Sequence, residues 1–223
     1  FLADSGIELM PNKTVKVDAY FRTSDEDIYA VGDCATVTNR ETGQPAWSPM
    51  GSSANIEGRL LAKTLAGGGQ PYPGVLQTAV CRLPGLNAGR TGLSQEQAKA
   101  AGYDPISVVT VVDDKAHYYP GAGNFIVKMT ADRATGKFLG IQVLGPGAVD
   151  KMVDIAVTAL TLKASLADLE NMDLAYAPPF STAIHPFVHT VNILLNKMSG
   201  AFETMTPEEF AAGAAGEYQI VDA

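Results

Sequence analysis

The sequence Thr23-Ser24-Asp25-Glu26-Asp27-Ile28-Tyr29-Ala30-Val31-Gly32-Asp33 places polar residues before a short apolar run that ends at a Gly-Asp pair. Because Ile, Tyr and Val pack well on a pleated surface, the run 28–31 predicts a buried strand. A glycine after a strand lets the backbone approach a ligand closely, and an aspartate at a strand's carboxyl end lies where open α/β sheets bind ligands. A loop and a helix over about residues 51–66 are expected next. The stretch therefore predicts a ligand site between a strand and a helix.

Composition limits the class of protein. The 223 residues suffice for one large or two small domains, and 46% hydrophobic residues with a mean hydropathy of +0.06 support a packed core. The formal net charge of −8 and the lack of a basic stripe argue against nucleic-acid binding, and the acidic balance disfavours anionic membranes. The sequence has no signal-peptide pattern and no apolar run of the roughly 18 residues that a transmembrane helix needs. We therefore expect neither a nucleic-acid nor a membrane partner.

The two cysteines, Cys34 and Cys81, form no Cys-x-x-Cys motif and no disulfide framework. This usage predicts a reducing, cytoplasmic location. Cys34 directly follows the Gly-Asp pair, and Cys81 lies in the middle of a predicted strand. We expect both to be small buried residues rather than redox nucleophiles.

The chain changes character after a segment rich in Pro and Gly, residues 70–74, which predicts a domain boundary. Beyond it, β-branched runs predict strands, and amphipathic segments with N-caps such as Ser94 predict helices. The expected strands cover residues 75–83, 86–92, 106–112, 125–129 and 138–144, and the expected helices cover residues 94–102, 149–164, 165–172 and 187–198. This order predicts an α+β fold with an antiparallel sheet and helices on one face.

The opening stretch resembles the second flavin-binding motif of the FAD-dependent pyridine nucleotide-disulfide oxidoreductases. That motif reads Thr, four variable residues, an aliphatic residue, an aromatic residue, Ala, any residue, Gly and Asp. Every fixed position is matched here, by Thr23, Ile28, Tyr29, Ala30, Gly32 and Asp33. The resemblance implies that the Asp33 carboxylate accepts a hydrogen bond from a ribityl hydroxyl of FAD, with Gly32 beside it. The alternative is an ordinary Gly-Asp turn after a strand.

Small residues at the start of the next helix extend this resemblance. In the family this helix points its N-terminus at the flavin ring, which makes Pro49, Met50, Gly51 and Ala54 the expected cofactor contacts. Small side chains permit the close approach of a ring, and free N–H groups at a helix start favour anionic character. The alternative is a plain helix capped by Ser48 with Pro49.

Two tyrosine-containing patches, His117-Tyr118-Tyr119-Pro120-Gly121 and Ala175-Tyr176-Ala177-Pro178-Pro179-Phe180-Ser181, look like those of coenzyme A-disulfide reductases and related NADH oxidases. In that group such tyrosines cross the dimer interface to the flavin and the redox cysteine of the partner. The resemblance therefore implies catalytic roles for Tyr118 and Tyr176. The alternative is that tyrosines between prolines anchor a dimer interface, where Tyr is enriched anyway, and Tyr119 is assigned to packing.

One departure from that group is His185-Pro186, where an Asp-Pro pair is expected. A His-Pro pair is similar to the acid/base histidine of the glutathione reductase and lipoamide dehydrogenase branch, but the Thr and Glu of that motif are missing. His185 and His189 also share one helix face at i, i+4, which is a spacing used in metal pairs. No third ligand is near in sequence, so we expect no metal.

The resemblance implies a C-terminal fragment of a homodimeric flavoprotein. Residues 1–70 would be the end of an α/β FAD-binding domain, residues 75–200 the dimerisation domain, and residues 201–223 a linker with the first helix and strand of a rhodanese-like domain. Electrons would pass from NAD(P)H through FAD to a small-molecule disulfide such as coenzyme A disulfide or persulfide. No Gly-x-Gly-x-x-Gly motif is present, so the fragment alone is expected to be inactive. An NADH oxidase and a non-catalytic dimerisation module are the alternatives.

Overall fold

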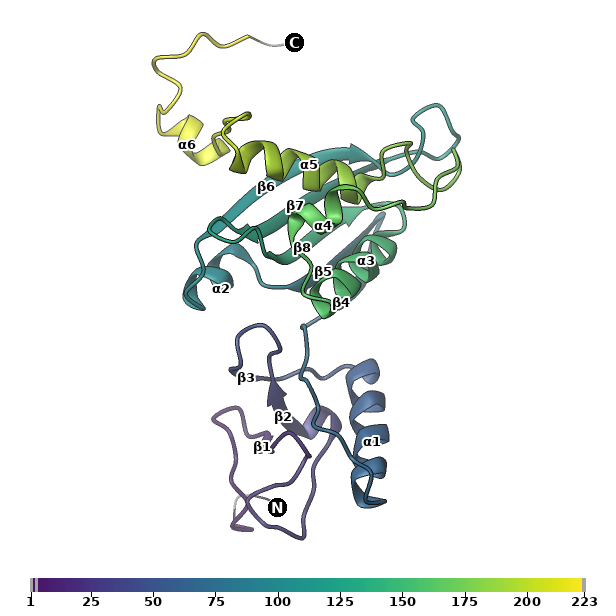
Figure 1. Ribbon diagram of the computed structural model, residues 1–223, viewed down its shortest axis with the longest axis vertical. Helices are drawn as coiled ribbons and strands as arrows, with labels where there is room; N and C mark the ends of the chain where they lie inside the picture. Colours follow the sequence, from purple (N-terminus) through teal and green to yellow (C-terminus); the bar gives the residue numbers. More distant parts are fainter. Residues whose placement is uncertain (1, 3, 222–223) are drawn as a thin grey trace.

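The computed structural model describes residues 2 and 4–221, and its strands lie in two β-sheets (Figure 1). The first sheet has the order β1-β2-β3 and consists of three short strands, β1 (Val15–Lys16), β2 (Ala35–Thr38) and β3 (Pro45–Ala46). Strand β1 pairs parallel with β2, and β2 pairs antiparallel with β3. Helix α1 (Gly51–Leu65) lies beside this sheet and packs against a short 3-10 helix, η1 (Gly32–Cys34).

The second sheet has five strands in the order β4-β5-β8-β7-β6, and each neighbouring pair is antiparallel. The strands are β4 (Ala79–Leu83), β5 (Leu86–Gly92), β6 (Pro105–Asp113), β7 (Asn124–Asp132) and β8 (Phe138–Gly145). Strand β4 begins later than the sequence predicts, because Val75 forms only an isolated parallel bridge with Asn39 of the first part.

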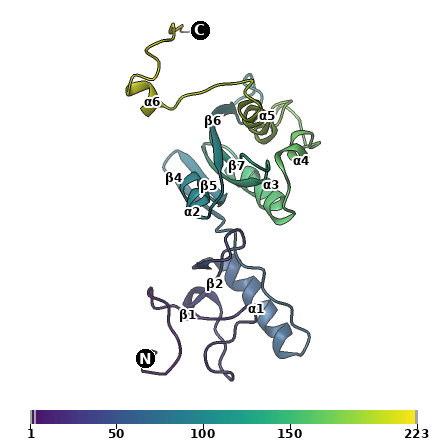
Figure 2. The ribbon, with the colours of Figure 1, turned by 60° about the vertical axis from the view of Figure 1, so that its left-hand side comes forward.

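Helices α3 (Val149–Thr161) and α5 (Pro186–Met198) cover one face of this sheet (Figures 1 and 2). Helix α3 packs on β5 and β8, and α5 packs on β6 and β7. The alternation along β6 follows from this arrangement, since Val108 is buried under the helices while Val109 and Val111 are exposed on the other face. The remaining helices are α2 (Gln95–Ala100), α4 (Leu166–Glu170) and α6 (Pro207–Ala211). The prediction of an α+β fold with helices on one face of an antiparallel sheet is confirmed.

Side chains connect the two parts of the chain. The Nζ of Lys137, directly before β8, donates to Oε2 of Glu41 at 2.7 Å and to the hydroxyl of Tyr103 at 3.1 Å. Arg40 donates to the backbone oxygen of Thr161 at the end of α3 at 3.0 Å. These contacts join the loop between β2 and β3 to the second sheet and its helices. Among the residues described, no helix combines the length and the apolar character needed to cross a membrane.

The predicted strand over residues 28–31 is wrong. Only Tyr29 forms a bridge, with Arg22, and Ile28 is 41% exposed. The segment folds back on the residues before it, because Ala30 N donates to Phe21 O at 3.0 Å and Thr23 N donates to Ile28 O at 3.0 Å. The sheet instead uses the residues that follow the Gly-Asp pair, in β2.

The buried face of α1 does not follow its large apolar residues. Ile56 and Leu65 are exposed, whereas Ser53 and Glu57 are the buried residues of this helix. The Glu57 carboxylate therefore lies on the buried face of α1, where a backbone donor satisfies it, as described below. In the tail, residues 218–221 form no strand, and Asp222 lies outside the described residues, so only the predicted helix of this segment is observed, as α6.

Gly92, at the end of β5, has a positive φ of +74°, and a Cβ atom there would collide with the backbone oxygen of Leu139. We expect Gly92→Ala to lower the free energy of unfolding by roughly 2–4 kcal/mol, about 1 of it from the left-handed backbone and the rest from overpacking. The matched control is Gly102→Ala, because Gly102 also has a positive φ (+88°) but open space around its Cβ position. Denaturant unfolding of both variants separates the two costs, and equal losses would contradict the close packing at Gly92.

Candidate functional site

The Gly32-Asp33 pair forms the first two residues of η1. Gly32 has a φ of +77°, which favours glycine, and a Cβ atom there would lie 3.5 Å from the Cβ of Ala54. The turn therefore sits directly against the first turn of α1. The structure brings together Gly32, Asp33 and Ala54, which the sequence predicted to share one site.

The Asp33 carboxylate is exposed, and it makes no hydrogen bond or ion pair within the part of the chain that the structure describes. Its backbone oxygen accepts a hydrogen bond from Nε1 of Trp47 at 2.9 Å. The indole thus holds the main chain of the turn while the carboxylate stays free to accept from a ligand. An ionised carboxylate is a strong acceptor for a hydroxyl group.

Glu57 is a residue of the site that the sequence reading missed. Its carboxylate is buried on α1, with 1% of the residue exposed, and Oε2 accepts a hydrogen bond from Gly32 N at 2.6 Å. Burial raises the pKa of Glu57, the charge of Asp33 raises it further, and the bond from Gly32 opposes both. Burial and the negative charge of Glu57 in turn raise the pKa of Tyr72 to about 12. The signal in the sequence was the i, i+4 spacing of Ser53 and Glu57, which puts both on one face of the helix.

The start of α1 has no side-chain cap. The N-cap residue is Met50, whose side chain makes no capping bond, and Ser48 instead shares a hydrogen bond with the hydroxyl of Ser53 at 2.9 Å. The alternative of a helix capped by Ser48 with Pro49 is therefore wrong. Pro49 and Gly51 are exposed and Met50 is half-buried, so free N–H groups of the first turn lie beside small, accessible residues.

The two tyrosine loops lie at one end of the second sheet, far from the Gly32-Asp33 turn of the same chain (Figure 1). Tyr118, in the loop between β6 and β7, is 68% exposed, and Tyr176, in the segment between α4 and α5, is 51% exposed. Tyr119 is less exposed, at 38%. Tyr118 and Tyr176 are thus accessible to a partner. Within one chain they do not lie near the Gly-Asp turn.

His185 does not lie at the surface. It is buried at the start of α5, where its Nδ1 accepts a hydrogen bond from Phe187 N at 3.2 Å. Burial, with the positive charge of Lys151, lowers its pKa to about 4. The ring is thus neutral at neutral pH and acts as a helix cap, which argues against an acid/base role. His189 is exposed, and no group of three metal-ligating residues occurs in the described residues.

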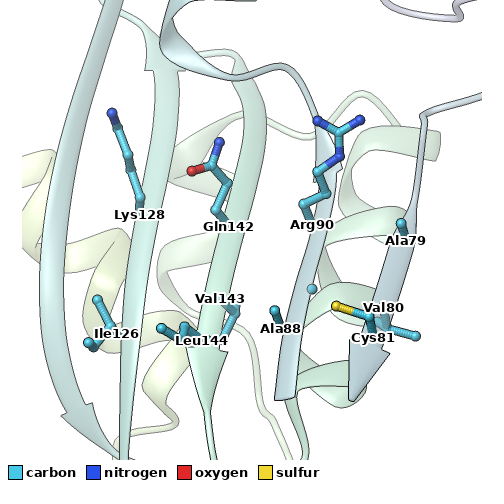
Figure 3. A pocket seen from close by; sticks show the side chains of 11 residues that line it. Ala79, Val80, Cys81, Ala88, Arg90, Ile126, Lys128, Gln142, Val143 and Leu144 are labelled. Atoms are coloured by element: carbon cyan, nitrogen blue, oxygen red, sulfur yellow. The ribbon is translucent and has the colours of Figure 1, made fainter. Parts of the chain in front are cut away.

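The uncovered face of the second sheet contains a hollow of about 450 Å³ (Figure 3). Arg90, Lys128 and Gln142 stand along it from neighbouring strands, and none of the predicted site residues lines it. Cys81 lies at its edge and is exposed, and Cys34 is exposed as well. The prediction that both cysteines are buried is wrong, because Cys81 points to the face that the helices leave open and Cys34 ends the exposed turn η1.

Curated relatives match most of the chain but are much longer. The NAD(P)H sulfur oxidoreductase (CoA-dependent) of Pyrococcus furiosus is 31% identical over 189 residues, which are 85% of this chain and 42% of that protein. The NADH oxidase of Methanocaldococcus jannaschii is 32% identical over 185 residues, which are 83% of this chain and 41% of that protein. The chain therefore spans about two fifths of the length of the curated relatives that it matches.

Solved structures share the fold. A NAD-dependent persulfide reductase from A. fulgidus has a TM-score of 0.88 and 36% identity, covering 93% of this chain and 39% of that one. Reduced Bacillus anthracis CoADR-RHD has a TM-score of 0.89 and 31% identity, covering 95% of this chain and 38% of that one. The arrangement of both sheets is thus one that known oxidoreductases use.

The buried carboxylate of Glu57 should make the free energy of unfolding depend on pH. The pKa of Glu57 is raised in the folded chain, so the folded state binds the carboxyl proton more tightly than the unfolded state does. The free energy of unfolding therefore increases as pH falls and this group becomes protonated. Between neutral pH and about pH 4, we expect the native protein to gain stability relative to Glu57→Gln. Denaturant unfolding at several pH values measures the difference, with the exposed Glu170→Gln as control. A difference that is constant with pH would contradict the burial of an ionisable group.

Two family descriptions match the chain. Pyridine nucleotide-disulphide oxidoreductase matches residues 1–54, and the dimerisation domain of pyridine nucleotide-disulphide oxidoreductases matches residues 79–187. The first range contains the Gly32-Asp33 turn, the second contains all five strands of the antiparallel sheet, and together they span more than half of the chain. The chain belongs to the pyridine nucleotide-disulphide oxidoreductases, a family that is FAD-dependent and uses NAD(P)H, and it carries the dimerisation domain of that family.

Proposed function

We propose that the chain is part of a homodimeric flavoprotein that passes electrons from NAD(P)H through FAD to a disulfide, such as coenzyme A disulfide or a persulfide. The observation that carries this proposal is the Gly32-Asp33 turn, which Glu57 and Trp47 hold against the uncapped start of α1. Relatives described as a persulfide reductase and as a CoA-dependent sulfur oxidoreductase support the choice of acceptor.

The residues of this chain would bind and orient the cofactor. When bound, FAD supplies the means to take a hydride from NAD(P)H and pass on its two electrons. The free carboxylate of Asp33 would accept a hydrogen bond from a ribityl hydroxyl of FAD. Pro49, Met50, Gly51 and Ala54 would let the flavin approach the start of α1, whose N–H groups favour negative charge.

Tyr118 and Tyr176 would act on the partner chain in the homodimer. A phenol hydroxyl can donate a hydrogen bond to a thiolate or a proton to a leaving sulfur. The net reaction with coenzyme A disulfide consumes one NAD(P)H and one proton and releases two thiols. With a coenzyme A persulfide, the same two electrons release one thiol and hydrogen sulfide.

The second candidate is an NADH oxidase, which the relative from M. jannaschii favours. In that case the electrons would pass to oxygen and no thiol would appear. A third candidate is a dimerisation module that binds no flavin when residues 1–223 stand alone. Purified residues 1–223 would then be a colourless dimer, whereas retained flavin would make the protein yellow.

Asp33→Ala tests the cofactor site. A hydrogen bond to a charged group contributes about 1.5–3 kcal/mol, so we expect the full-length apoprotein to bind FAD about 10- to 100-fold more weakly. Fluorescence titration with FAD measures the affinity. Asp27→Ala removes the same charge from an exposed position in the same stretch and should leave the affinity unchanged. Wild-type affinity in Asp33→Ala would overturn the assignment of the turn.

The electron acceptor is tested by stoichiometry. With the full-length holoprotein and coenzyme A disulfide under anaerobic conditions, we expect two thiols for each NAD(P)H oxidised. Oxidation of NAD(P)H only when oxygen is admitted, with no thiol formed, would support the NADH oxidase instead. Residues 1–223 alone should oxidise no NAD(P)H, since no Gly-x-Gly-x-x-Gly loop is present in them. Turnover by this piece would contradict the proposal.

A further inference from the structure

The loop that carries Tyr118 is closed by one buried carboxylate. Asp114 directly follows β6 and is 6% exposed. Its backbone N–H donates to Gly123 O at 2.8 Å, and its Oδ1 accepts from Gly123 N at 2.9 Å. Both bonds join the two ends of the loop over residues 114–123, so Asp114 fixes where the loop leaves the sheet and returns to it.

The second oxygen of this carboxylate faces the start of α3. A Cβ atom at Gly147 would collide with Oδ2 of Asp114, so only a glycine allows this approach. The N-cap of α3 is Ala148, which offers no side-chain cap, and the negative charge of Asp114 lies near the positive end of the helix dipole. Lys115 Nζ lies 3.9 Å from the same oxygen. The carboxylate that closes the Tyr118 loop thereby packs against Gly147, in the segment that leads into α3.

The segment that carries Tyr176 is attached to the first turn of α3 itself. Lys151 Nζ donates to the backbone oxygen of Phe180 at 2.8 Å. Phe180 N donates to Ala177 O at 2.8 Å, which makes a tight turn directly after Tyr176. Among the residues described, Lys151 is the one side chain from outside residues 173–185 that donates a hydrogen bond into this segment. The hydroxyl of Ser181, next in the chain, is buried without a partner, so it adds no bond to the turn.

Lys151 and Asp114 are also electrostatically coupled. Burial lowers the pKa of Lys151, and the negative charges of Asp114 and Asp150 offset only part of this decrease. The cation in turn lowers the pKa of the buried His185. The charge of Asp114, which closes the Tyr118 loop, thus acts on Lys151, which donates to the Tyr176 segment.

We propose that Asp114, packed on Gly147 just before α3, and Lys151, in the first turn of α3, are positioning residues that hold the two tyrosine loops in one fixed relation. The positions of Tyr118 and Tyr176 then depend on one helix end and not on two independent loops. The role of the tyrosines rests on the proposed function, but the attachment of the loops does not.

Hydrogen exchange of the full-length holoprotein tests the attachment. Lys151→Met removes the donor to Phe180 O, and we expect exchange of the Phe180 and Ser181 amides to speed up about tenfold, as the loss of one hydrogen bond to a charged group predicts. Lys115→Met is the matched control, because it removes a lysine beside the same Asp114 that makes no bond to this loop. Lys151→Arg keeps a cationic donor and should restore protection. Equal exchange in Lys151→Met and Lys115→Met would overturn the proposal.

A double-mutant cycle tests the consequence for turnover. We expect Lys151→Met to slow turnover in the native background but to have no further effect in Tyr176→Phe, because both changes act through one hydroxyl. Additive effects would overturn the positioning role. If Tyr176→Phe alone leaves turnover unchanged, the catalytic role of the tyrosine fails, and the exchange measurement still decides whether Lys151 holds the loop.

Discussion

The five-stranded sheet has to bury one face, and the rest of this structure depends on how it does so. Helices α3 and α5 cover the strands with side chains such as Val153, Phe187 and Leu194, which are almost fully buried. Burial of this kind contributes about 25 cal/mol per Å² of apolar surface and fixes both helices on the sheet. The start of α3 is therefore firmly held, and from it Lys151 reaches the backbone of one exposed loop while Gly147, just before it, packs against the carboxylate that closes the other.

The first part of the chain is organised by a polar constraint instead. A backbone N–H at Gly32 would be costly to bury without an acceptor, and Glu57 supplies one from inside the neighbouring helix. The buried carboxylate makes the Gly-Asp turn depend on α1 rather than on the small sheet, whose strands are only two to four residues long. The position of the turn thus does not depend on the Asp33 side chain, whose carboxylate remains exposed.

Much of the second part could be predicted from the sequence, because β6 is a long β-branched run and two of its helices have the side-chain caps Ser94 and Ser165. The first part could not be predicted so well. Residues 28–31 have the composition of a strand, but only pairing with a neighbour makes a strand, and Tyr29 finds a single bridge. The sequence alone does not show that Glu57 is buried, because only the position of Gly32 in space reveals its partner. The loop anchors Asp114 and Lys151 were missed because their partners are backbone atoms, nine and 29 residues away, which a pattern of side chains does not reveal.

The positions of the two candidate regions bear on how the proposed enzyme would work. The Gly32-Asp33 turn and the tyrosine loops lie in different parts of one chain (Figure 1), and the contacts of Lys137 and Arg40 tie those parts together. A motion large enough to bring Tyr118 or Tyr176 to the turn of the same chain would have to break these contacts. A second copy of the chain removes that cost, because the tyrosines of one copy can meet the flavin of the other while each chain keeps its own packing. Under the proposed function, dimerisation is then a requirement for a complete site as well as a source of stability.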